Sequence, residues 1–145
     1  MWAACHPKSE GEMAECHELG KSLSKLLQPT ILYLLAAADE PLHGYVISQQ
    51  AADSPMFGGA KPDPTGIYRQ LASMEKEGLV ASHWDTDKSG PAKKLYRLTD
   101  AGRRTLRRWL DSLGCYALTI GELRGAIATS LGIDLPEAPV CGDAA

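Results

Sequence analysis

The chain has 145 residues, of which 44% are apolar and 23% charged, and its formal net charge is −3, which indicates one compact globular core and too little chain for two. No run approaches the roughly 20 apolar residues that a membrane-spanning helix needs. The first twenty residues contain four glutamates and no apolar segment, which does not fit a secretory signal, so we expect a cytoplasmic protein of bacterial type.

Residues 1–18 show little periodicity, and we expect a mobile arm there. The four cysteines of the chain are Cys5, Cys16, Cys115 and Cys141. The first two are each followed by a histidine, and thiolate and imidazole groups are zinc ligands. The spacing matches no zinc motif, however, and ordinary reduced cysteines are the simpler interpretation. We predict no bound metal and no cofactor, and keep a metal- or thiol-responsive sensor as the alternative.

Two helices are expected before residue 55. The first lies within 19–38, where Pro29 either interrupts the helix or opens a second one in its first turn. Residues 29–38 are almost continuously apolar, so this part is expected to be buried. After a turn, a second helix is predicted from Leu42 to about Ala52, with the inward-facing residues Leu42, Tyr45, Val46 and Ile47. Two prolines and two glycines then make 51–62 a loop.

The segment 63–78 predicts a helix with well-marked ends. Asp63 can cap its start, and Pro64 suits the first helical position, where its fixed φ fits and no donor is lost. Gly78 can end it, because glycine tolerates positive φ. The apolar stripe of this helix consists of Ile67, Leu71 and Met74.

Residues 79–84 and 94–99 are rich in β-forming side chains and predict a hairpin. The nine residues between them, 85–93, include Ser89-Gly90-Pro91 and are too many for a tight turn, so we expect a projecting loop. A helix followed by such a hairpin is the layout of a winged helix-turn-helix, in which the helix enters a major groove and the wing lies along phosphates. The predicted fold class is therefore mainly α with a small β-hairpin.

Two more helices are expected after the hairpin. The first begins at Asp100-Ala101-Gly102 and ends near Gly114, with the apolar stripe Leu106, Trp109, Leu110 and Leu113. Its other face carries Arg103, Arg104, Arg107 and Arg108, which can meet flanking phosphates or a partner subunit, or can simply be solvated. A short amphipathic helix over 116–131 follows and stops at Gly132.

The predicted domain organisation follows from these elements. Residues 1–18 are the mobile arm and 19–113 the winged helix-turn-helix domain. Residues 114–132 form a short C-terminal helix, expected at a dimer seam, and 133–145 a disordered tail.

The charge is unevenly distributed. Residues 1–60 hold three Lys or Arg against seven Asp or Glu, 61–112 hold eleven against seven, and 113–145 hold one against four. The net positive charge is thus confined to the predicted helix, wing and following helix, a distribution typical of phosphate contact that an ordinary solvated surface can also show.

The candidate DNA-binding residues lie on the helix that follows Asp63 and on the wing. Positions 65, 68, 69 and 72 share one helical face. Arg69 can fork onto guanine O6 and N7, whereas Thr65 and Tyr68 suit phosphate oxygens, although Tyr68 also suits core packing. Non-specific attraction that weakens with salt is expected from Lys61, Lys88, Lys93 and Lys94.

Four sequence stretches together resemble the PadR family of bacterial transcriptional regulators. They are Pro41-Leu42-His43-Gly44-Tyr45, Thr65-Gly66-Ile67-Tyr68-Arg69-Gln70-Leu71, Glu75-Lys76-Glu77-Gly78-Leu79-Val80 and Tyr96-Arg97-Leu98-Thr99-Asp100-Ala101-Gly102. The resemblance extends from about residue 29 to 113. Within the family, Met74-Glu75, Ser82-His83-Trp84 and Ser89-Gly90-Pro91-Ala92 are most similar to the poly-β-hydroxybutyrate-responsive repressors.

The resemblance implies a homodimeric repressor that binds an inverted-repeat operator in double-stranded DNA. It also implies that a small-molecule effector relieves the repression. It places the dimer seam, or an effector pocket beside it, at the C-terminal helices, where Trp109, Leu113 and Tyr116 are the candidates. The segment after Leu113 is short and glycine-interrupted, and so departs from the long final helix of many members.

Catalysis is not expected, because the sequence shows no set of nucleophile, base and orienting residue and no phosphate-binding glycine loop. His43 is expected to cap or pack, and His83 to be partly buried on its strand. Besides the sensor, a winged module that binds protein instead of DNA remains a weaker alternative.

Overall fold

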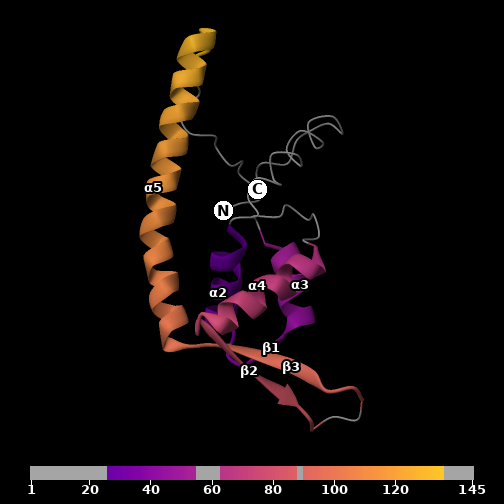
Figure 1. The fold of residues 1–145 in the computed structure, drawn as a ribbon. Coiled ribbons are helices and arrows are strands. Elements are labelled where there is room, and N and C mark those ends of the chain that lie inside the picture. The colour runs from indigo at the N-terminus through magenta and orange to yellow at the C-terminus, as the bar shows by residue number, and fades with distance from the viewer. Residues whose placement is uncertain (1–25, 55–62, 88–89, 136–145) are drawn as a thin grey trace.

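The computed structural model describes residues 26–54, 63–87 and 90–135. Its elements are α2 (Leu27–Ala37), β1 (Leu42–His43), α3 (Gly44–Ala52), α4 (Pro64–Lys76), β2 (Val80–Asp85), β3 (Lys93–Leu98) and α5 (Asp100–Leu131). Three short helices and a small sheet form a body from which α5 extends as a rod (Figure 1). The predicted N-terminal arm and most of the predicted tail, residues 136–145, lie outside the described residues.

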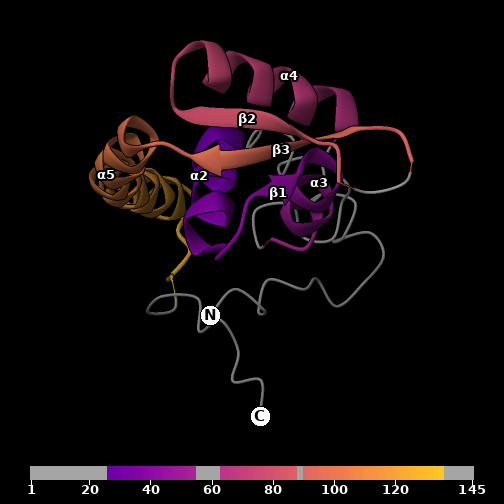
Figure 2. The same cartoon turned by 90° about the horizontal axis from the view of Figure 1, so that it is seen from below.

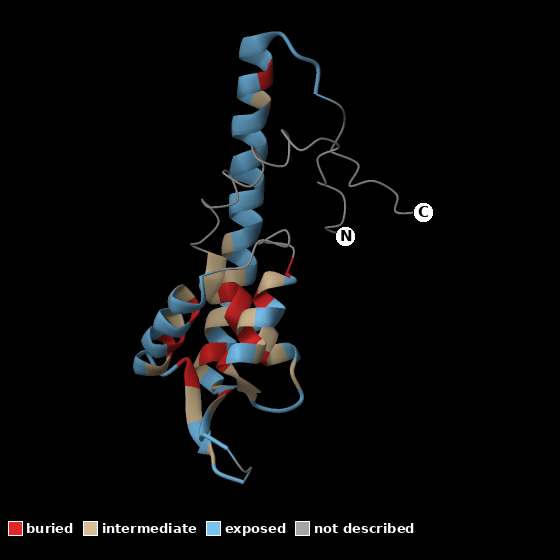
Figure 3. Cartoon of the chain, turned by 90° about the vertical axis from the view of Figure 1, so that its right-hand side faces the viewer, coloured by how far each residue is buried: buried red, intermediate tan, exposed pale blue. Residues whose placement is uncertain are grey.

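The core lies where α2 meets the other two short helices and the sheet. From α2 it takes Ile31, Leu32 and Leu35, and the remaining members are Ile47, Ala51, Ile67, Leu71, Met74, Leu79, Val80 and Tyr96. Figure 2 shows α4 alongside β2 and α3 alongside β1. Buried residues are concentrated in this body, whereas most of α5 is exposed (Figure 3).

The ends of α4 are those that the sequence predicts. The Asp63 carboxylate accepts a hydrogen bond from the Thr65 N–H at 3.2 Å, and Pro64 occupies the first turn. Gly78 has φ of 76° just after the helix, a conformation that favours glycine. The stripe Ile67, Leu71 and Met74 is fully buried, so the opposite side of α4 is left facing solvent.

The predicted hairpin is confirmed, with each strand displaced by one residue from its expected bounds. β2 pairs antiparallel with β3, from Val80 opposite Leu98 to Asp85 opposite Lys93. The sheet has three strands in the order β1-β3-β2, which makes the arrangement of helices and wing a winged helix-turn-helix.

The prediction that a helix begins at Leu42 is wrong. Leu42 and His43 form β1 and pair with Tyr96 and Leu95 of β3, and α3 begins only at Gly44. This pairing joins segments more than fifty positions apart, so no local pattern announces it. Tyr45, predicted to face inward, is 66% exposed.

Pro29 lies in the first turn of α2, where its missing N–H has no intrahelical partner to lose.

The predicted helix end near Gly114 is also wrong, because α5 continues without a break to Leu131 over 32 residues. A single glycine costs a helix only about 1 kcal/mol relative to alanine, too little to end one that is favoured on both sides. Gly132, with φ of 66°, does end the helix as predicted. The short separate C-terminal helix is therefore the second half of one long helix.

The start of α5 is tied to the end of α4. The Thr99 hydroxyl accepts a hydrogen bond from the Gly102 N–H at 3.0 Å and lies 2.6 Å from the Gly78 carbonyl oxygen, to which it donates. Gly102 is buried, and a Cβ there would lie 2.0 Å from the Leu79 carbonyl oxygen. Only glycine therefore allows this approach of helix to strand.

Gly102→Ala is expected to lower the free energy of unfolding by about 2–3 kcal/mol, because backbone must move to admit the methyl group. The matched control is Gly121→Ala on the same helix, where a Cβ meets nothing within 4 Å and helix propensity predicts a gain of up to about 1 kcal/mol. Urea unfolding followed by circular dichroism measures both changes. Equal effects of the two substitutions would contradict the close approach at Gly102.

Candidate nucleic-acid interface

The face of α4 that is predicted to contact DNA is exposed to solvent. Thr65, Tyr68, Arg69 and Ala72 are all exposed, and they lie on the side of the helix away from its buried stripe. Thr65 lies three and four residues before Tyr68 and Arg69, and Ala72 lies four and three residues after them, so the four side chains share one side of the helix. Helix α4 therefore has one side buried in the core and the opposite side exposed to solvent.

Tyr68 combines the two roles that the sequence left open. It is 46% exposed, yet its ring packs over Gly44 at the start of α3. A Cβ on Gly44 would lie 2.5 Å from Tyr68 Cε1 and 3.3 Å from the hydroxyl oxygen. The absence of a side chain at Gly44 therefore lets the ring pack against the start of α3 while much of Tyr68 stays in solvent.

The four predicted lysines divide into three groups. Lys61 and Lys88 lie outside the described residues. Lys93 is exposed at the first position of β3. Lys94 is half-buried, and its Nζ lies 2.9 Å from Glu75 Oε2. Lys94 is therefore already engaged with a carboxylate, which sequence reasoning did not foresee.

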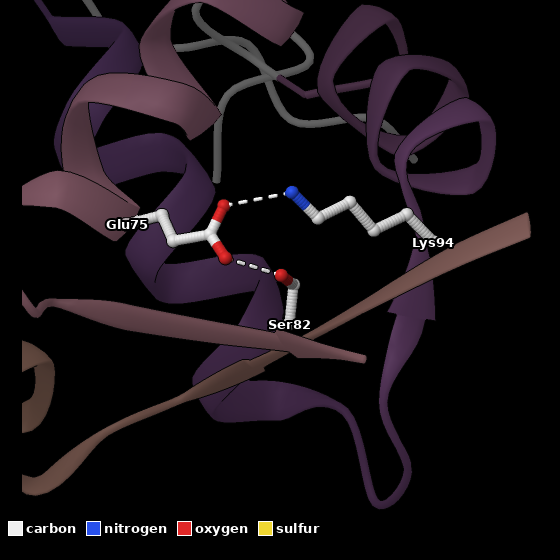
Figure 4. Close-up of polar contacts among 3 residues, drawn as sticks. All are labelled: Glu75, Ser82 and Lys94. Atoms are coloured by element: carbon white, nitrogen blue, oxygen red, sulfur yellow. Dashed lines mark hydrogen bonds and ion pairs between the residues drawn. The ribbon is translucent and has the colours of Figure 1, made fainter. Parts of the chain in front are cut away.

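Glu75 connects the helix to both strands of the wing. Its second oxygen, Oε1, accepts a hydrogen bond from the Ser82 hydroxyl of β2, while Oε2 accepts from Lys94 of β3 (Figure 4). These hydrogen bonds, first from Ser82 and then from Lys94, hold the pKa of Glu75 below its ordinary value of 4.5. The same bond to Glu75 raises the pKa of Lys94 above 10.5. Both groups are charged at neutral pH, and Lys94 also lies over the Tyr96 ring, 5.6 Å from its centroid.

A cavity of about 370 Å³ opens between α3, α4 and the wing. Its lining consists of His43, Gly44, Tyr45, Val46, Tyr68, Lys93, Lys94 and Tyr96. It thus borders Tyr68 and Lys93, two residues of the predicted DNA-binding set.

Sequence reasoning gave Trp84 no role at the interface. Trp84 is 61% exposed and pairs with Lys94 across the hairpin. It follows Ser82 by two positions, so it lies on the face of the sheet that meets α4. Its neighbour His83 is exposed, contrary to the prediction of partial burial.

His43 packs and does not cap. No side-chain hydrogen bond caps the start of α3, and His43 Nε2 lies 3.9 Å from Asp85 Oδ2. Its Nδ1 is buried and has no hydrogen-bond partner among the described residues.

The residues predicted at a seam or effector pocket lie along one side of α5. Trp109 packs against the core and donates a hydrogen bond from Nε1 to Gln28 Oε1 of α2 at 3.1 Å. Leu113 is 36% exposed and Tyr116 51% exposed, because α5 has left the body by this point. The four arginines predicted on the other face of this helix are exposed.

The sensor alternative acquires no support from the described residues. Cys115 is exposed on α5, and the other three cysteines lie outside the described ranges. Within those ranges no three His, Cys, Asp or Glu side chains gather as metal ligands would. No helix in the described ranges is both long and apolar enough to cross a membrane.

Comparison with known proteins identifies relatives of this fold. The model of the transcriptional regulator PadR-like family matches residues 31–108. A conserved protein described as a potential transcriptional factor, whose crystal structure is known, is 33% identical, with 76% of this chain and 94% of that chain covered and a TM-score of 0.59. No curated protein matches the chain.

Two further similar structures are of PadR and a PadR-like regulator. A PadR-like transcriptional regulator from Bacillus cereus is 28% identical, with 71% and 95% of the two chains covered and a TM-score of 0.58. Bacillus subtilis PadR in complex with operator DNA is 28% identical, with 59% of this chain and 47% of that chain covered and a TM-score of 0.51.

Glu75→Gln is expected to destabilise the protein by roughly 0.5–1 kcal/mol at pH 7, since a partly exposed ion pair is worth no more than about this. The pKa of Glu75 is lowered on folding, so its contribution is present above pH 4.5 and is lost as the pH falls through the lowered pKa. Thermal unfolding at pH 7 and below pH 3 measures the difference. Glu77→Gln, on the exposed side of the same turn, is the control and should change the stability little at either pH. A loss of stability in Glu75→Gln that persists below pH 3 would contradict the role assigned to the Glu75 carboxylate.

Proposed function

The chain belongs to the PadR-like family of transcriptional regulators, and on that premise we propose that it is a sequence-specific DNA-binding regulator. It acts in the bacterial cytoplasm as a homodimeric repressor, and a small-molecule effector relieves the repression. The observation that carries the proposal is the exposed face of α4, held beside Lys93 and the wing by the Glu75 contacts. A similar protein, Bacillus subtilis PadR, has been crystallised with operator DNA, which supports DNA as the ligand.

In the proposed complex α4 is the recognition helix. Arg69 projects from its exposed face, and its planar guanidinium can bind guanine O6 and N7 together, worth about 1–3 kcal/mol of discrimination. Thr65 and Tyr68 bind phosphate oxygens and set the register without reading sequence. Lys93, with Lys61, Lys88 and Lys94, supplies attraction that weakens with salt.

The rod-like part of α5 supports a homodimer. Its apolar residues follow alternating steps of three and four, the spacing of a coiled-coil seam; the series is Leu106, Trp109, Leu113, Tyr116, Ile120, Leu123 and Ile127. The first two pack against the core, but Ile120, Leu123 and Ile127 are 62%, 61% and 50% exposed. An apolar stripe of this length on a monomer is unfavourable, and pairing with the same stripe of a second copy would bury it.

A twofold dimer places two α4 helices in symmetric positions, which an inverted-repeat operator matches. Repression follows if such an operator overlaps a promoter. We propose that the effector binds where the seam leaves the body, at Trp109, Leu113 and Tyr116, because a ligand there would change the angle between the copies and so the spacing of the two recognition helices.

The first test is a salt titration of binding to the DNA upstream of the protein's own gene, with random DNA as competitor. Binding that outcompetes random DNA and weakens steeply with salt is expected. Arg69→Ala should then cost about 1–3 kcal/mol of specific binding, and Lys93→Ala should reduce the salt slope by about one.

The matched control for both variants is Arg97→Ala. Arg97 is exposed on β3, one position from buried Tyr96, so it lies on the face of the sheet away from α4. It removes the same charge and should leave specific binding almost unchanged. If all three variants bind the operator as the wild type does, the recognition role of α4 and the wing is refuted.

The homodimer is tested by sedimentation equilibrium of two variants of α5. Leu123→Lys places a charge in the stripe and is expected to weaken dimerisation at least tenfold. Leu118→Lys is the control, because Leu118 is 73% exposed and lies on the opposite side of the helix from the stripe. A wild-type monomer, or equal effects of the two lysines, would contradict the seam.

A further inference from the structure

The cavity at the base of the wing has two lysines and three tyrosines among its lining residues. Lys93 and Lys94 can offer ammonium groups to a ligand there, and Tyr68 can offer its hydroxyl, whereas the Tyr45 hydroxyl already accepts a hydrogen bond from Gln49 Nε2. None of the described residues that line it is acidic.

The charge of Lys94 is offset by Glu75 at 2.9 Å. Lys93 stands opposite Asp85 in the hairpin but makes no ion pair with a described residue, so it is the lining lysine available to a ligand.

The first turn of α3 forms one wall of this cavity through Gly44, Tyr45 and Val46. Backbone N–H groups in a first turn have no partner within their helix, and this turn contains no acidic residue and no side-chain cap. These groups add donors to those of the side chains.

The position of Tyr68 is a second, independent feature. Because Gly44 has no side chain, the Tyr68 hydroxyl lies within 3.3 Å of where a Cβ would be, so α4 delivers a donor directly to the start of α3. The walls also include three tyrosine rings, Tyr45, Tyr68 and Tyr96, which suit contact with the carbon face of a sugar. A volume of about 370 Å³ lies at the lower end of the range for small-molecule sites and exceeds the needs of a bare phosphate.

We propose that this cavity binds one phosphate ester, with the phosphate between Lys93, the Tyr68 hydroxyl and the first N–H groups of α3, and the sugar against the tyrosine rings. The ester has two sources, a backbone phosphate of the DNA strand that passes between α4 and the wing, or a free sugar phosphate. The DNA source rests on the proposed function; the cavity site does not.

The test follows the backbone amide signals of Gly44, Tyr45 and Val46 by ¹H–¹⁵N NMR while inorganic phosphate replaces chloride at constant ionic strength. Saturable shifts are expected, with tighter binding of 2-deoxyribose 5-phosphate because its sugar meets the rings. Lys93→Gln should weaken binding at least threefold, and Arg97→Gln, the same charge change at a position of β3 that does not line the cavity, should not. Shifts that never saturate, or equal weakening by both variants, overturn the proposal.

A short duplex of random sequence distinguishes the two sources. If DNA shifts the same amides and prevents the phosphate-induced shifts, the backbone supplies the ester. If DNA binds elsewhere and phosphate still shifts these amides, the site takes a free ester. DNA binding with no shift at these amides in any titration removes the cavity site and leaves the proposed function intact, whereas saturable phosphate binding without DNA binding does the reverse.

Discussion

One carboxylate ties both strands of the wing to α4. Glu75 accepts hydrogen bonds from Ser82 of β2 and Lys94 of β3, so a single side chain contacts two strands from one helix. Beyond Tyr96 and Val80 the strands have left the core, and there the Glu75 contacts add to the pairing of β1 with β3 in holding the wing. Both charges are retained over a wide pH range, since the pKa of Glu75 is lowered and that of Lys94 raised. In the proposed complex, this contact sets the distance between the groove-reading face and the phosphate-binding wing.

A second rigid junction joins the wing to the rod. Thr99 caps α5 and at the same time bonds to the Gly78 carbonyl at the end of α4, and Gly102 allows α5 to begin against the Leu79 backbone. α5 and the tip of the hairpin lie at opposite ends of the body (Figure 2). The two junctions therefore connect α5 to the end of α4, and α4 to the wing.

The cavity changes how the predicted DNA-binding residues are interpreted. Tyr68 and Lys93 come from different elements, yet both line the same space with the first turn of α3. Lys94 was expected to be a fourth independent cation, but its charge is offset by Glu75. Its contact with Glu75 instead helps to position the wing against α4. The proposed interface is thus better described as a helix face and a cavity beside it than as a row of basic side chains.

Local chemistry made much of this protein predictable. The cap at Asp63, the stripe Ile67, Leu71 and Met74, and the stop at Gly132 are decided by neighbouring residues, and all three were correct. Two features were decided by the tertiary structure alone: β1 exists because Leu42 and His43 meet β3, and Lys94 is engaged because folding brings Glu75 to it. The end predicted near Gly114 was wrong for a local reason, since one glycine costs a helix too little to end it. Sequence periodicity records which side of an element is apolar, but pairing between distant segments depends on the free energy of the whole fold, which no local window contains.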